Sequence, residues 1–156
     1  QSFAKDQVEL IELEVQKELE KYFIVRISWV FGINGNNFVK TMLKLAETRN
    51  EINVVSDQIG SPTYTYDLSY KLIDLLRTDE YGIYHITNNG FISWYEFATK
   101  IFELANIEVK VNPILTKDYL TKAKRPFNSR METSGLTLRD WDKALNHYIK
   151  ELKKNV

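Results

Sequence analysis

The sequence has 156 residues, which suits one ordinary domain, or a piece of a larger protein, with a buried core. Its 21 Lys and Arg residues balance 21 Asp and Glu residues, so no overall charge favours nucleic acid or an anionic membrane as a partner. The absence of cysteine excludes disulfides, a thiolate nucleophile and a cysteine-ligated zinc. No apolar run approaches the roughly 20 residues of a membrane span, and the charged N-terminus is no signal peptide. We therefore expect a single domain over residues 1–156, located in the cytoplasm.

The first part of the chain predicts helices and strands in alternation. Apolar residues recur at helical spacing over 7–20, which predicts a helix. The β-branched and aromatic run 23–30 predicts a buried strand. Residues 38–46 again show helical spacing, and 52–55 predict a short strand.

The second part continues the alternation. Asp67 is a candidate cap for a helix that runs to Leu76, and residues 81–87 alternate like a strand. Ser93, with Glu96 three residues later, has the spacing of a capping box at the start of a helix.

Near the C-terminus, 107–111 predict a strand stopped by Pro113, and 138–152 predict the last helix. No repeat or linker marks a domain boundary. The alternation predicts an α/β fold.

The loop after the first predicted strand is rich in Gly and Asn. The side chains of Asn36 and Asn37 can cap the next helix, whose free N–H groups and dipole would suit an anion. Gly and Asn are equally typical of a plain turn, so both interpretations stay open. A dinucleotide fingerprint needs a third glycine after Gly32 and Gly35, and this loop has none. A P-loop needs a lysine outside the helix, but Lys40 lies inside the predicted helix, so neither motif is present.

A second polar loop contains Arg125, Asn128 and Ser129 after two lysines. The planar guanidinium of arginine suits a diphosphate, and Asn and Ser can bond a ribose or a base. A solvated basic turn is the alternative. His85 and His147 have no carboxylate at metal-ligand spacing, so the sequence predicts no metal site.

Four segments in order resemble dTDP-4-dehydrorhamnose reductase, a family of the extended short-chain dehydrogenase/reductase superfamily. They read VRISWVFGINGNNFVKTML, VVSDQIGSPTYTYDL, GIYHITNNGFISWYEFATKIFELANI and AKRPFNSRMETSGL. The resemblance implies part of a Rossmann-like parallel sheet, the C-terminal half, merging into a small mixed α/β substrate-binding lobe. It also implies an NADPH-dependent reduction of the 4-keto group of a dTDP-sugar, in the biosynthesis of dTDP-L-rhamnose.

The same resemblance implies that the cofactor-binding N-terminal half of the family is absent from these residues. Family members use a Tyr-x-x-x-Lys pair as proton donor, expected 18 to 23 residues before Arg26. Residues 3–8 stand there instead, and no tyrosine of the chain has a lysine four places on. We expect no catalytic residue here and no binding of NADPH by this chain alone.

The family motifs imply a set of substrate-binding residues. They are Trp29 beside the sugar, Asn36 and Asn37 near the nucleotide sugar, Gln58 and Thr63 in a loop at the pocket, and Arg125 and Ser129 on the nucleotide side. Some members bind magnesium at a dimer contact through a glutamate, and Tyr66 takes that position here. We expect no metal.

Two functions follow as hypotheses. The first is the dTDP-sugar-binding lobe of the reductase, inactive alone, with a missing N-terminal half or a second copy of the chain as its protein partner. The second is a non-catalytic nucleotide-sugar-binding or regulatory module, which the missing Tyr and Lys favour.

Overall fold

The computed structural model describes residues 2–119 and 125–154, and the side chains from residue 7 onward. The helices are α1 (Ser2–Glu18), α2 (Phe38–Ala46), α3 (Thr65–Leu76), α4 (Trp94–Ala105), α5 (Trp141–Lys154) and a short 3-10 helix, η1 (Thr116–Asp118). The strands are β1 (Phe23–Arg26), β2 (Val30–Phe31), β3 (Glu51–Val55), β4 (Ile59–Gly60), β5 (Thr63–Tyr64), β6 (Gly82–His85), β7 (Ile92–Ser93), β8 (Lys110–Ile114) and β9 (Asn128–Ser129).

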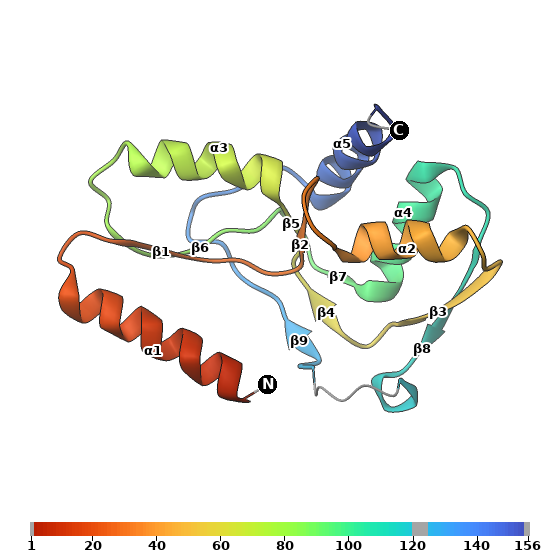
Figure 1. Ribbon diagram of the computed structural model, residues 1–156, viewed down its shortest axis with the longest axis horizontal. Helices are drawn as coiled ribbons and strands as arrows, with labels where there is room; N and C mark the ends of the chain where they lie inside the picture. The colour runs from red at the N-terminus through yellow and green to blue at the C-terminus, as the bar shows by residue number, and fades with distance from the viewer. Residues whose placement is uncertain (1, 120–124, 155–156) are drawn as a thin grey trace.

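The strands form small sheets in which parallel pairing dominates. β1 pairs with β6, β2 with β5 and β3 with β8, all in parallel. β4 lies between β7, which is antiparallel to it, and β9, which is parallel. At one end of the molecule α1 and α3 lie on opposite sides of the β1–β6 pair, and at the other end α2 and α4 lie beside β3 and β8 (Figure 1). The predicted α/β class with a partial parallel sheet is confirmed.

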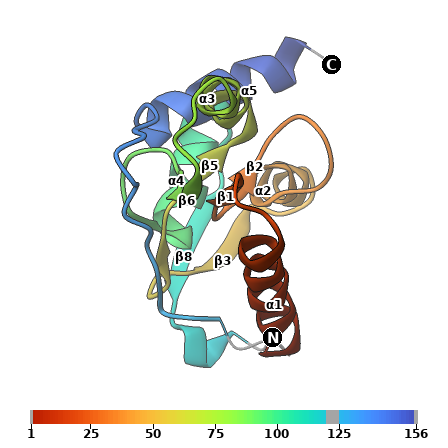
Figure 2. The same cartoon turned by 90° about the vertical axis from the view of Figure 1, so that its left-hand side faces the viewer.

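The main core lies where α2, α4 and α5 meet the strands. Val39, Phe97, Ile101, Leu145 and Tyr148 are all almost completely buried there. These residues are the inward positions of the helices predicted from their apolar spacing. Figure 2 shows α5 across the top of the molecule, with α4 and α2 below it on either side of β1.

The predicted capping box of α4 is confirmed. Ser93 Oγ accepts a hydrogen bond from the N–H of Glu96 at 3.1 Å, and the Glu96 carboxylate accepts one from the N–H of Ser93 at 2.6 Å. The two bonds satisfy N–H groups that would have no partner within the helix, so the start of α4 is fixed.

The prediction of one buried strand over 23–30 is wrong. The run splits into β1 and β2, because Trp29 has φ +45°, a left-handed conformation that ends strand geometry. The residues of β1 are only half-buried or exposed. The side chains of β1 are therefore still partly open to solvent.

The predicted end of a strand at Pro113 is also wrong. β8 continues through Pro113, which pairs with Val54 of β3. β8 has β3 as its only strand neighbour in the described chain, so the missing N–H of proline can face away from the pair. An edge strand tolerates proline where a central strand does not.

The predicted cap at Asp67 is wrong as well. α3 begins at Thr65, after Tyr64, which makes no side-chain capping bond. Asp67 lies in the first turn and forms an ion pair with Arg139, at 2.7 Å. The buried side chain of Asn88 joins them, because its Nδ2 donates to Asp67 Oδ2 at 2.8 Å and its Oδ1 accepts from the N–H of Tyr64, also at 2.8 Å. Asp67 thus pairs with Arg139, 72 residues away, and does not cap the helix.

The first helix is confirmed, but its apolar residues do not enter the core. Val8, Leu10, Ile11 and Leu13 are between 54% and 63% exposed. No helix within the described ranges is both long and apolar enough to cross a membrane.

One ion pair joins α1 to the sheet. Arg26 Nη2 lies 2.5 Å from Glu12 Oε2, and Arg26 Nε donates to the same carboxylate at 3.1 Å. Hydrogen bonding from Arg26 holds the pKa of Glu12 below its usual value. A polar contact therefore positions α1 where apolar packing does not.

Candidate functional site

A cavity of about 370 Å³ lies between α2, α4, the end of β3 and η1. It is lined by Phe38, Met42, Asn53, Val54, Val55, Gln58, Trp94, Thr116, Tyr119 and Arg125. Apolar and aromatic side chains form most of this wall, with a few polar groups and one cation. That composition is typical of a small-molecule site that holds a flat ring and an anionic group.

The tryptophan predicted from the sequence lies directly behind this wall. Trp29 stacks on Trp94 with ring centroids 3.5 Å apart and an interplanar angle of 10°. Its Nε1 donates to Ser129 Oγ at 3.2 Å, and Ser129 Oγ donates in turn to the carbonyl of Ile59 at 3.2 Å. Two predicted site residues, 100 positions apart, are thus directly bonded.

Gly60 explains why a glycine is required beside this ring. A Cβ atom placed on Gly60 would lie 2.3 Å from Cε2 of Trp29, far closer than any real contact. The backbone of β4 therefore packs against the indole of Trp29, and Trp94 stacks on it, both indoles being partly buried against the main core. Trp29 holds the wall of the cavity in place from behind.

Gln58 belongs to the cavity and is held by a short chain of hydrogen bonds. It is 5% exposed, and its Nε2 donates to Thr116 Oγ1 at 3.1 Å. Thr116 Oγ1 donates its own hydrogen to Asp57 Oδ1 at 2.6 Å, and the N–H of Thr116 donates to the same oxygen at 2.9 Å. The loop that carries Gln58 is thus fastened to η1.

Thr63 does not reach this cavity. It is completely buried in β5, and its N–H donates to the carbonyl of Trp29 at 3.1 Å. Its Oγ1 is the only sealed side-chain oxygen or nitrogen without a hydrogen-bond partner in the described chain. The backbone hydrogen bond of Thr63 joins β5 to Trp29. A substrate contact by Thr63 stays a prediction.

The Asn-rich loop is closed by its own contacts. Asn37 is the N-cap of α2: its Oδ1 accepts from the N–H of Lys40 at 3.0 Å. Its Nδ2 donates to the carbonyl of Gly32 and to Tyr148 Oη, each at 3.0 Å. Lys40 Nζ donates to the carbonyls of Ile33 and, at 2.9 Å, Gly35.

These contacts leave few polar atoms of the loop free. The polar atoms of the Asn37 side chain are used within the loop, and Asn36 is exposed. The free backbone N–H groups at a helix N-terminus can bind a phosphate, and here Asn37 Oδ1 caps one of them, that of Lys40. The loop is therefore partly closed by its own hydrogen bonds. Substrate binding by Asn36 and Asn37 stays a prediction.

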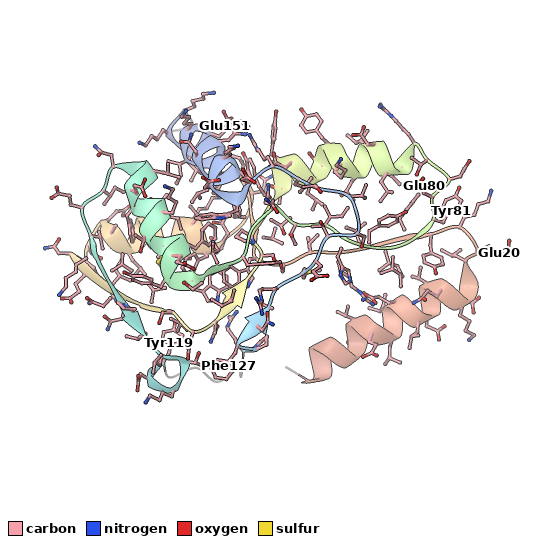
Figure 3. All side chains as sticks on the ribbon, turned by 180° about the vertical axis from the view of Figure 1, so that it is seen from behind. Glu20, Glu80, Tyr81, Tyr119, Phe127 and Glu151 are labelled. Carbon is pink, nitrogen blue, oxygen red and sulfur yellow. The ribbon has the colours of Figure 1, made fainter. Side chains whose placement is uncertain are left out.

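Arg125 is exposed at the edge of the cavity, beyond η1. The preceding lysines, 122 and 124, lie outside the described residues. Tyr119, which follows η1, and Phe127, which precedes β9, lie at this same end of the molecule (Figure 3). The cavity thus has a cationic and aromatic rim suited to a phosphorylated ring compound.

The structure gathers four of the seven predicted residues: Gln58 and Arg125 line the cavity, and Trp29 and Ser129 support it. Sequence reasoning missed Trp94, Thr116 and Tyr119. Trp94 indicated only a compact core, as one of three tryptophans, and no local pattern marks a threonine in a 3-10 turn as a cavity residue.

The histidines have structural neighbours. His85 Nε2 lies 3.3 Å from Arg26 Nη1, and His147 Nδ1 lies 2.7 Å from Arg139 Nη2. Among the residues described, no three His, Asp or Glu side chains are grouped closely enough to hold a metal ion.

Comparison with known proteins identifies the family. The family model described as the RmlD substrate binding domain matches residues 8–154. The chain belongs to the RmlD substrate binding domain family. The predicted resemblance to dTDP-4-dehydrorhamnose reductase is therefore confirmed at the level of the family.

Two curated relatives of this RmlD domain show how much of a longer protein it represents. The chain is 49% identical over 133 residues to the spore coat polysaccharide biosynthesis protein SpsK of Bacillus subtilis (strain 168), covering 82% of this chain and 47% of that protein. It is 44% identical over 146 residues to dTDP-4-dehydrorhamnose reductase of Aggregatibacter actinomycetemcomitans, covering 81% and 49%. The chain spans about half the length of these relatives.

Solved structures agree with the fold. The crystal structure of dTDP-4-dehydrorhamnose reductase from Bacillus anthracis in complex with NADP matches with a TM-score of 0.87 and 44% identity, over 90% of this chain and 52% of that one. An orthologue from Clostridium acetobutylicum matches with a TM-score of 0.87 and 40% identity, over 91% and 52%. The RmlD domain therefore has the architecture of about half of these reductases.

Proposed function

We propose that this RmlD domain is the dTDP-sugar-binding lobe of a dTDP-4-dehydrorhamnose reductase-like enzyme, and that residues 1–156 are one domain that does not turn over substrate alone. The observation that carries the proposal is the convergence of family motifs on one cavity. Gln58 and Arg125 line it, while Trp29 and Ser129 bond to each other behind its wall.

The chemistry of the cavity supports a nucleotide diphosphate as ligand. Trp94 and Tyr119 offer aromatic surface on which a base can stack, and Arg125 offers a planar cation that can bond two phosphate oxygens at once. A ring bound at the aromatic wall would place its phosphates toward the exposed rim.

Two buried tyrosines support inactivity of the chain alone. Proton donation to a carbonyl at neutral pH needs a phenol whose pKa is lowered, as a neighbouring lysine would lower it. Burial raises the pKa of Tyr64 to about 12, and burial also raises the pKa of Tyr148. Neither is followed by a lysine four places on. NADPH binding and hydride delivery are accordingly assigned to residues outside this chain.

The test is a titration of the chain with dTDP, followed by ligand-observed NMR. We expect weak binding, because part of the pocket wall of the family is missing from this chain and binding must order the rim. Arg125→Ala should weaken binding by about tenfold, the usual effect of losing a charge-assisted hydrogen bond. Arg77→Ala is the matched control, an exposed arginine at the end of α3 that does not line the cavity. Equal binding by both variants, or no binding by the wild type, refutes the proposal.

A non-catalytic regulatory module remains the second candidate, favoured by the absence of a Tyr-x-x-x-Lys pair from the 156 residues. It predicts a stable complex with another protein and no affinity for dTDP. Mixing the chain with a separately expressed N-terminal half of a close relative distinguishes the two. Restored oxidation of NADPH by the keto-sugar would support the lobe, and no restoration together with no dTDP binding would support the module.

A further inference from the structure

The amide of Gln58 has an orientation that its surroundings determine. Thr116 Oγ1 has a single hydrogen, which it donates to the carboxylate of Asp57 at 2.6 Å. Toward Gln58 the hydroxyl can therefore only accept, and the side of the amide that meets it at 3.1 Å must be the NH₂ group. The carbonyl oxygen, Oε1, then points away from Thr116.

This carbonyl oxygen is available within the cavity. No donor among the described residues reaches Gln58 Oε1, although the whole residue is only 5% exposed. Oε1 is also accessible to solvent, because Thr63 Oγ1 is the only side-chain nitrogen or oxygen of the described chain that is both shielded from solvent and without a hydrogen-bond partner. Since Gln58 lines the cavity, the opening through which Oε1 is reached is the cavity itself. A ligand that fills the cavity and excludes water from Oε1 must therefore donate a hydrogen bond to it, or leave a buried acceptor unpaired.

A second amide in the cavity has the opposite polarity. Asn112 Nδ2 donates to the carboxylate of Glu51 and, at 3.1 Å, to Asn53 Oδ1. The oxygen of Asn53 is thus used, and its NH₂ group is left to donate. Of the two side-chain amides that line the cavity, Gln58 therefore offers an acceptor and Asn53 a donor, beside the aromatic rings of Phe38 and Trp94.

We propose that Gln58 reads the base of the bound nucleotide by accepting a hydrogen bond from the ring N–H of an imide base, thymine or uracil, with Asp57 and Thr116 as positioning residues. This inference rests on the proposed function. An imide edge has an N–H between two carbonyl groups, which matches one acceptor and one donor in the wall. The flat ring suits the aromatic surface, while the cation at Arg125 lies at the exposed rim for the phosphates.

The experiment compares thymidine 5′-diphosphate with its N3-methyl analogue, which lacks the donor. Binding of each to the 156-residue chain is measured by ligand-observed NMR, together with the side-chain amide signal of Gln58 in a ¹⁵N-labelled sample. The wild type should bind thymidine diphosphate about tenfold more tightly than the analogue, because the methyl group removes the hydrogen bond and leaves the acceptor unpaired. The Gln58 signal should shift with thymidine diphosphate only.

Two variants locate the effect. Gln58→Met keeps the volume of the side chain and removes its amide, so it should weaken thymidine diphosphate to the affinity of the analogue and leave the analogue unchanged. Thr116→Val frees the amide to rotate, so it should reduce the discrimination partly. Ser56→Ala is the control for Thr116→Val, since Ser56 Oγ donates to the carbonyl of Ile114 nearby without contacting Gln58.

The outcomes separate the two proposals. If the wild type binds both diphosphates equally, or Gln58→Met keeps the discrimination, the inference about Gln58 is overturned while the proposed function stands. If the wild type binds neither, both are overturned. Should Gln58→Met fail to fold by circular dichroism, Thr116→Val decides: discrimination equal to that of Ser56→Ala overturns the inference.

Discussion

Replacing Gly60 by alanine tests the packing behind the cavity. The new methyl group would lie 2.3 Å from Cε2 and 2.5 Å from Cζ2 of Trp29, so either the indole or β4 must move. Moving the indole breaks its bond to Ser129 Oγ and its stack on Trp94. The wall of the cavity would then lose its support.

The size of the effect follows from these contacts. Overpacking costs about 2 kcal/mol, the lost hydrogen bond about 1 kcal/mol and the disturbed aromatic pair about 1 kcal/mol. Alanine in place of glycine recovers about 0.7 kcal/mol by restricting the unfolded chain. We expect Gly60→Ala to lower the free energy of unfolding by about 3 kcal/mol.

Urea unfolding and near-ultraviolet circular dichroism measure this. The two stacked indoles should give a coupled signal that the variant loses. Gly35→Ala is the matched control: Gly35 has φ +72°, and a Cβ there meets nothing within 4 Å. It should cost only about 1 kcal/mol for the left-handed backbone and leave the indole signal intact. Equal stability losses and unchanged indole signals in both variants would refute the packing argument.

Three further predictions concern the scaffold. Ser93→Ala removes the capping box and should cost about 1 kcal/mol in urea unfolding, whereas unchanged stability would mean that the cap is redundant. Asn88→Ala leaves the N–H of Tyr64 and other buried groups unpaired, so we expect a loss of about 3 kcal/mol by the same assay; a loss below about 1 kcal/mol would contradict this. The hydrogen bond from Arg26 lowers the pKa of Glu12 below 4.5, so its stabilising effect is complete above pH 4.5 and is lost as the pH falls through the lowered pKa. Amide protection of the first helix, corrected for intrinsic exchange rates, should fall in that range, and Glu12→Gln should show the reduced protection already at pH 7; protection that is equal at all pH values and in both proteins would exclude this role.

Local signals in the sequence predicted much of the fold. The capping box at Ser93 and the apolar spacing of α2 and α5 specify helices by contacts within a few residues, and these helices form as predicted. The end of the first strand depended on the left-handed backbone of Trp29, which is set by packing against Gly60 and Trp94, distant in the chain. Sequence spacing carries no information on such a contact.

The candidate site shows the same division. Family motifs pointed to Gln58 and Arg125, which line one cavity. The orientation of the Gln58 amide depends on Thr116, which stands 58 residues later in a turn without a motif. The hydrogen bonds by which Thr116 links Gln58 to Asp57 form only when the chain is folded.

The most direct measurement is a crystal structure of the chain grown with dTDP. We predict density for the base at the aromatic wall of the cavity, within hydrogen-bond distance of Gln58, with the diphosphate toward Arg125. Density for the nucleotide at the Asn-rich loop before α2, with the cavity empty, would contradict this prediction.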